Sequence, residues 1–126
     1  MEQLFPKDRR PTPNSHHKQA EDLMFEADAA ERLGDREKAK ELRLRAATHE
    51  EKSLALIPLG KVRTRAIIGN SAVALHFKAG NFQGAKDLGV KLLGDPTLIG
   101  QDRNLNDIRE IIERIENKNY PQQETR

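Results

Sequence analysis

The chain has 126 residues, 33% of them charged and 36% hydrophobic, a length that suits one domain with one core. Its formal net charge is +2, and acids and bases are interspersed in runs such as DREKAKELRLR, which argues against nucleic acid as a partner. With no cysteine, the chain excludes disulfides, thiolate zinc sites and a cysteine nucleophile.

The beginning of the chain, MEQLFPKDRRPTPNSHH, lacks an apolar run of signal-peptide length. No later stretch reaches the roughly 18 to 20 apolar residues of a membrane span. We therefore expect a cytoplasmic protein with no membrane partner.

Residues 1–14 combine three prolines with charged and polar side chains, a composition that disfavours both a helix and a packed core. We expect them to form a flexible N-terminal arm. Leu4 and Phe5 are its substantial apolar groups, and either they belong to a mobile terminus or they enter a groove.

Residues 15–57 predict two antiparallel helices, because a short turn at Gly34 separates two amphipathic stretches. Asn14 or Ser15 can cap the first helix, and Asp35 can cap the second. The core-facing stripes are Ala20, Leu23, Ala27, Ala30 and Leu33 in the first helix, and Ala39, Leu42, Ala46 and Leu54 in the second.

Residues 62–79 should form the central helix of an all-α bundle, because apolar and small residues surround nearly its whole circumference. Gly80 and Asn81 repeat the chemistry of the first turn, and a fourth helix follows to about residue 93. A fifth helix over residues 102–117 places Leu105, Ile108, Ile112 and Ile115 on one face. It either caps the stack or forms a dimer seam, and residues 119–126 are expected to be a disordered tail.

Two segments, ADAAERLGDREKAKELRLRA and SAVALHFKAGNFQGAKDLGVKL, share a small-rich helix, a Gly-Asp/Asn turn and a second amphipathic helix. This pattern resembles the tetratricopeptide repeat. The resemblance implies that residues 15–118 form antiparallel hairpins stacked as a right-handed bundle of about five helices, two repeat units plus a capping helix. The matching positions are Ala27, Gly34, Asp35, Ala39 and Ala46, then Val73, Gly80, Asn81, Phe82 and Ala85.

The chain departs from that family in three ways. The separation of Gly34 and Gly80 exceeds the repeat period of about 34 residues by about three helical turns. The Trp and Tyr of the signature are missing, and Arg36 replaces the turn aromatic of the first unit. The family also needs about three repeats for stability, so the fifth helix would have to replace the third.

The resemblance also implies a binding groove on the inner faces of the first and third helices. Met24 and Phe77 would be its apolar anchors, although Met24 and Asp28 cannot supply the Lys and Asn with which some members of the family bind a peptide carboxylate. The residues that this face would present to a partner are Met24, Asp28, Arg32, Asn70, Ser71, Phe77 and Lys78.

Arg63 and Arg65 lie at the start of the third helix, where the helix dipole disfavours positive charge. Either acids at the end of the second helix, such as Glu50 and Glu51, pair with them, or they bind an anion or a partner carboxylate.

No metal, cofactor or catalytic residue is expected. His16, His17 and Glu21 could approach a metal, but histidines at a helix start are more often solvated. His49 and His76 are expected to be satisfied, partly buried histidines rather than catalytic bases. The stretch GKVRT at residues 60–64 lacks the spacing of a phosphate-binding loop.

These observations favour a non-enzymatic protein–protein interaction module, an adaptor or scaffold that binds a peptide or helix of a partner. The alternative is a structural homo-oligomer, for example a homodimer, assembled through the C-terminal helix or the exposed edge of the stack. A nucleic-acid accessory would instead use the bases Lys7, Arg9, Arg10, Lys61, Arg63 and Arg65.

Overall fold

The computed structural model describes residues 11–118, so the expectations for residues 1–10 and 119–126 lie outside the described residues. Every element of the described part is helical, which confirms the all-α class. The elements are α1 (Pro13–Arg32), α2 (Arg36–Leu56), α3 (Val62–Lys78), α4 (Phe82–Leu93), the short 3-10 helix η1 (Pro96–Leu98) and α5 (Asp102–Glu116).

Helix α1 begins earlier than expected, because Thr12 rather than Asn14 or Ser15 is its N-cap. The backbone N–H of Ser15 donates to Thr12 Oγ1 at 3.0 Å, and the backbone N–H of Thr12 donates to Ser15 Oγ at 3.0 Å. Pro13 occupies the first helical turn, where its fixed φ suits a helix and its missing N–H costs nothing. The arm expected over residues 1–14 is therefore helical at its last two positions.

The two glycine turns form as the sequence predicts. Gly34 and Gly80 adopt φ of +86° and +81°, and Asp35 and Asn81 cap the following helices. Leu33 differs from its prediction, because this C-cap residue leaves the core-facing stripe and is 86% exposed.

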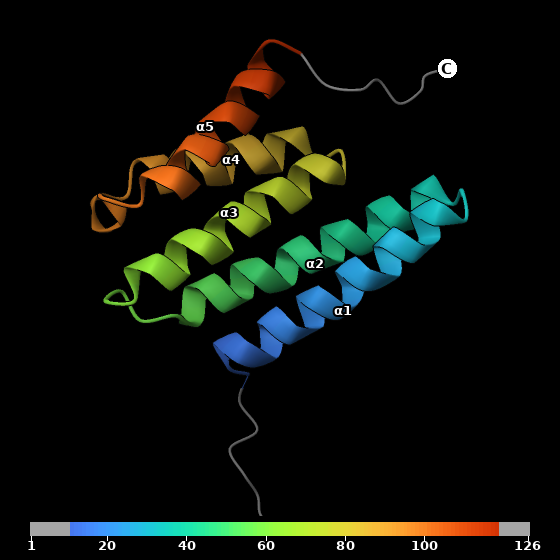
Figure 1. Ribbon diagram of the computed structural model, residues 1–126, viewed down its shortest axis with the longest axis horizontal. Coiled ribbons are helices and arrows are strands. Elements are labelled where there is room, and N and C mark those ends of the chain that lie inside the picture. Colours follow the sequence, from blue (N-terminus) through green and yellow to red (C-terminus); the bar gives the residue numbers. More distant parts are fainter. Residues whose placement is uncertain (1–10, 119–126) are drawn as a thin grey trace, which may run out of the picture.

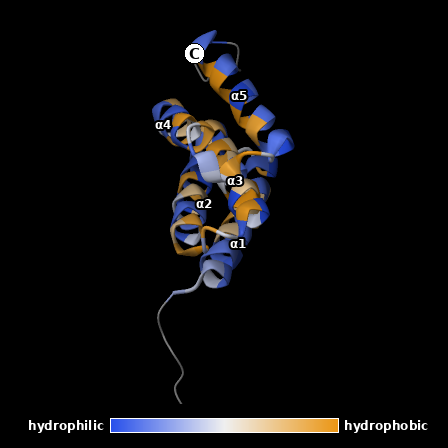
Figure 2. Ribbon diagram, turned by 90° about the vertical axis from the view of Figure 1, so that its left-hand side faces the viewer, coloured by the Kyte–Doolittle hydropathy of each residue, from blue (hydrophilic) through white to orange (hydrophobic). Residues whose placement is uncertain are grey.

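The helices form a two-layer stack. Figure 1 shows α1, α2, α3 and α4 side by side in chain order, with α5 crossing above α3 and α4. Figure 2 shows α2 and α4 on one side and α1, α3 and α5 on the other. Helix α1 packs chiefly on α2, whereas α5 packs on both α3 and α4. Helix α1 therefore forms one edge of the stack, and α5 closes the opposite end.

The buried residues form two clusters that meet at α3. The cluster between α1 and α2 is rich in alanine and also includes Leu23, Leu42 and Leu75. The second cluster joins the end of α2 to α3, α4, η1 and α5, and contains larger residues such as Leu98 and Ile108. Because α3 contributes to both clusters, it is the central helix that the sequence predicts. The stripe of α5 is buried within the chain through Leu105, Ile108 and Ile112, as expected of a capping helix.

Candidate functional site

Consecutive residues of α2 bind histidines of α1. His49 Nδ1 lies 3.0 Å from His16 Nδ1, so one imidazole donates the hydrogen and the other accepts it. The Glu50 carboxylate is fully buried and accepts a hydrogen bond from His17 Nδ1 at 3.0 Å. Glu21, one turn along α1, lies 3.3 Å from His17 Nε2. The expectation of a solvated helix start is thus wrong for His16, which is buried.

Two histidines of this network have shifted pKa values of opposite sign. Burial alone would lower the pKa of His17, but the hydrogen bond and charge of Glu50, together with Glu21, outweigh it and raise that pKa above its ordinary 6.5. Burial lowers the pKa of His49, and the positive charges of His16, Lys52 and Arg45 lower it further. Lys52 and Arg45 thus lie close enough to His49 to affect its protonation.

The third residue of this α2 run, Glu51, hydrogen-bonds to His76 Nε2 of α3, and the His76 Nδ1 atom lies 3.0 Å from Asn81 Nδ2. His49 and His76 are satisfied, partly or fully buried histidines, as the sequence predicts. Within residues 11–118, no group of three or more His, Asp or Glu side chains is arranged to hold a metal ion. The hydrogen bonds of the network join α1, α2 and α3.

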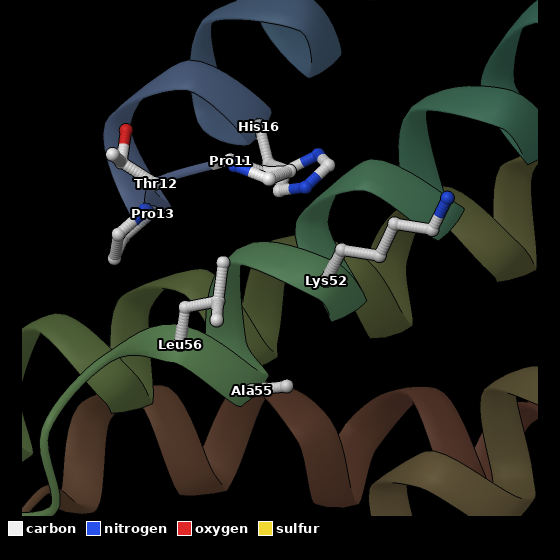
Figure 3. A pocket seen from close by; sticks show the side chains of 7 residues that line it. All are labelled: Pro11, Thr12, Pro13, His16, Lys52, Ala55 and Leu56. Atoms are coloured by element: carbon white, nitrogen blue, oxygen red, sulfur yellow. The ribbon is translucent and has the colours of Figure 1, made fainter. Parts of the chain in front are cut away.

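An open pocket of about 670 Å³ lies beside this network, between the start of α1 and the last turns of α2. Figure 3 shows Leu56 pointing from α2 toward the start of α1, whereas Lys52 extends past the His16 ring with its amino group directed away from Leu56. Beneath it, the buried Ser53 hydroxyl donates to the carbonyl of Pro13 at 2.9 Å and fixes the first turn of α1 on α2. The lining residues are Pro11, Thr12, Pro13, His16, Lys52, Ala55 and Leu56.

The sequence does not predict this pocket, because the apolar periodicity of α2 indicates only its core-facing stripe. Ala55 and Leu56 lie outside that stripe and are exposed, and Pro11 and Pro13 were assigned to the arm. The sequence offered one weak signal, the adjacent apolar residues Ala55 and Leu56 outside that stripe, because exposed apolar residues are common on helix surfaces.

The residues predicted for the binding face of α1 lie around the alanine-rich cluster. Met24 packs against that cluster and is half-buried. The Asp28 carboxylate accepts a hydrogen bond from Arg43 of α2 at 3.1 Å, so its charge is already paired. Arg32 is exposed.

The corresponding residues of α3 divide between the fold and the surface. Asn70 donates from Nδ2 to Asn104 Oδ1 at 3.0 Å, so its amide binds α5. Phe77 packs against the larger cluster, and its ring centroid lies 5.5 Å from that of Phe82. Ser71 is half-buried, and Lys78 is exposed. The structure therefore does not present Asn70 and Phe77 as ready contacts, and the role of the others stays a prediction.

Arg65 is bound within the chain, but its partners differ from those predicted. It donates from Nη1 to the backbone carbonyls of Leu54 and Ile57 at 3.1 and 2.9 Å. Its Nη2 lies 4.0 Å from the carboxylate of Asp95. The positive charge at the start of α3 is thus offset by the negative end of the α2 dipole. Pairing of Arg65 with Glu50 or Glu51 is wrong, because histidines occupy those carboxylates, while Arg63 is exposed.

Comparison with protein-family models, curated proteins and solved structures finds no match to this chain. None of the helices in residues 11–118 combines the length and the apolar character that crossing a membrane requires.

Proposed function

We propose that the protein is a non-enzymatic protein–protein interaction module that binds a peptide or helix of a partner. The observation that carries this proposal is the open pocket between α1 and α2, with apolar side chains from both helices at its lining. Its volume, about 670 Å³, falls in the range of ligand sites and is large enough for more than one side chain.

The pocket supports this function better than the predicted α1–α3 face does. On that face, Phe77 and Asn70 already contact other helices of the chain, and Asp28 is paired with Arg43. At the pocket, Ala55 and Leu56 are exposed at the end of α2, so their contact with a partner would require no rearrangement of the core.

The tetratricopeptide-like character of the stack is part of the same proposal. Its support is the alternation of helices between the two layers, together with the positive-φ glycines in equivalent turns. A cysteine-free chain suits a reducing compartment, and we propose the cytoplasm as the site of action.

The test is size-exclusion chromatography with light scattering on the full-length protein purified under native conditions, with mass spectrometry of the bound proteins. We expect a monomer with a stoichiometric partner, which Leu56→Glu removes. The matched control is Val90→Glu, because Val90 is an apolar residue of similar exposure, 54% against 46% for Leu56, on a different helix. Equal recovery of the partner by both variants would refute binding at the pocket.

The homo-oligomer is the second candidate, and it is favoured by the outer face of α1. Phe25 is 79% exposed on this edge helix, where a second copy could cover it. The seam through α5 has less support, because the α5 stripe is buried against α3 and α4. In the same light-scattering experiment, this candidate predicts a homodimer that contains no other protein and that Phe25→Glu converts to a monomer.

A further inference from the structure

We propose that the pocket recognises a partner segment in which an apolar side chain lies next to a carboxylate, with Lys52 as the partner of that carboxylate. This inference rests on the proposed function, and it specifies the chemistry of the bound segment. It concerns the outer side of the α1–α2 pair rather than the α1–α3 face.

The apolar part of the requirement follows from the lining. Pro11 and Pro13 contribute rings from the start of α1, and Ala55 and Leu56 contribute aliphatic groups from α2. Burial of apolar surface is the main favourable term in protein association, so the segment must place an apolar side chain here.

The charge requirement follows from the groups around the pocket. Among the described residues 11–118, none that lines the pocket is acidic, and Lys52 is one of the lining residues. Arg45, His49 and Lys52 follow one another at helical spacing on one face of α2, and Arg45 and Lys52 are both exposed. Burial is the main cause of the lowered pKa of His49, and the charges of Lys52 and Arg45 lower it further, as expected if both lie near this ring.

Two acids adjacent in sequence to Lys52 or His49, and the end of the α2 dipole, are engaged by other groups of the chain. The two acids in the same part of α2, Glu50 and Glu51, bind His17 and His76 away from the pocket. The negative end of the α2 dipole is covered by Arg65, whose guanidinium donates to the last carbonyls of that helix. The first turn of α1 contains no acid, and its dipole contributes further positive potential. A carboxylate therefore complements this surface.

The experiment is selection of random dodecapeptides displayed on phage against the immobilised full-length protein. Selected peptides are then synthesised with a fluorescein label and titrated by fluorescence anisotropy. We expect sequences that combine an apolar residue with Asp or Glu within about one helical turn, and affinity that falls as the NaCl concentration rises.

Variants separate this inference from the function on which it rests. Lys52→Glu should weaken binding by roughly fivefold or more, whereas Lys52→Arg should preserve it. Leu56→Glu should abolish binding, and Val90→Glu should not change it. Circular dichroism checks that each variant folds, which the exposure of these positions favours.

Three outcomes would overturn the inference. Selected peptides that lack acids, or that bind Lys52→Glu as tightly as the wild type, would refute the charge requirement while leaving a peptide-binding function intact. A labelled single-stranded oligothymidine that binds with the same dependence on Lys52 would assign this surface to nucleic acid instead. Failure to select any peptide that depends on Leu56 would count against the inference and the proposed function together.

Discussion

Replacement of Arg65 by Met should destabilise the protein far more than the same replacement at Arg63, which lies two residues earlier and on the other side of α3. Arg65→Met keeps an unbranched apolar side chain but removes the guanidinium that donates to the carbonyls of Leu54 and Ile57. Hydrogen bonds to charged groups contribute about 1.5 to 3 kcal/mol each. The lower end applies, because the Leu54 carbonyl also accepts the N–H of Ile57, and because the buried Arg65 Nε has no hydrogen-bond partner among residues 11–118.

The expected loss is therefore about 3 kcal/mol of the free energy of unfolding, or roughly 10 °C in Tm for a domain of this size. Urea unfolding followed by circular dichroism measures the first quantity, and differential scanning calorimetry measures the second. Arg63→Met should stay within about 0.5 kcal/mol of the wild type, because Arg63 is exposed. Equal effects of the two substitutions would refute the assignment of Arg65 as the cap of α2.

Three further predictions concern packing and protonation. Gly89→Ala should lower the free energy of unfolding by about 1 kcal/mol, because the new Cβ would lie 2.9 Å from Ile112 Cδ1 and the overpacking exceeds the gain in helix propensity. Urea unfolding and hydrogen exchange in α5 measure this loss, and an increase in stability would contradict the prediction. Phe77→Ala should lower stability by about 2 kcal/mol, less than for a fully buried Phe, and a variant as stable as the wild type would show that Phe77 is a surface anchor after all. Since the pKa of His17 is raised, the contribution of His17 to stability is complete below pH 6.5 and is lost as the pH rises through its folded-state pKa. The pKa of His49 is lowered, so the contribution of His49 to stability is complete above pH 6.5 and is lost as the pH falls toward its folded-state pKa. The free energy of unfolding should therefore be measured by urea unfolding from pH 5 to 8. We expect His17→Gln to reduce its pH dependence above pH 6.5 and His49→Gln to reduce its pH dependence below pH 6.5. The opposite pairing of variant and pH range would refute these protonation states.

The turns and the core-facing stripes could be predicted from the sequence because their causes are local. Gly34 and Gly80 occupy positive φ, where a side chain is strained, and the small polar residue after each of them caps the next helix. The α5 stripe was equally readable, since an apolar residue at every third or fourth position can be buried only on one face.

The polar pairing could not be predicted, because helical periodicity gives the buried face but not the depth or rotation of one helix against another. His16 and His49 meet only because of how α1 and α2 are aligned, and neither flanking pattern encodes that contact. Arg65 was expected to bind a carboxylate, yet it chiefly binds backbone carbonyls, which have no sequence signature. Leu98 was missed for a related reason, since it is fully buried from a three-residue helix too short to show a period.

Photo-crosslinking from position 56 tests binding at the pocket most directly. The full-length protein would carry benzoylphenylalanine in place of Leu56, or in place of Val90 as the control, and would be irradiated in its native cells before mass spectrometry. We expect a discrete crosslink from position 56 to one partner protein, through a segment that contains an apolar residue beside Asp or Glu, and no such crosslink from position 90. Identical crosslinks from both positions, or crosslinks from position 56 only to a second copy of the chain, would contradict it.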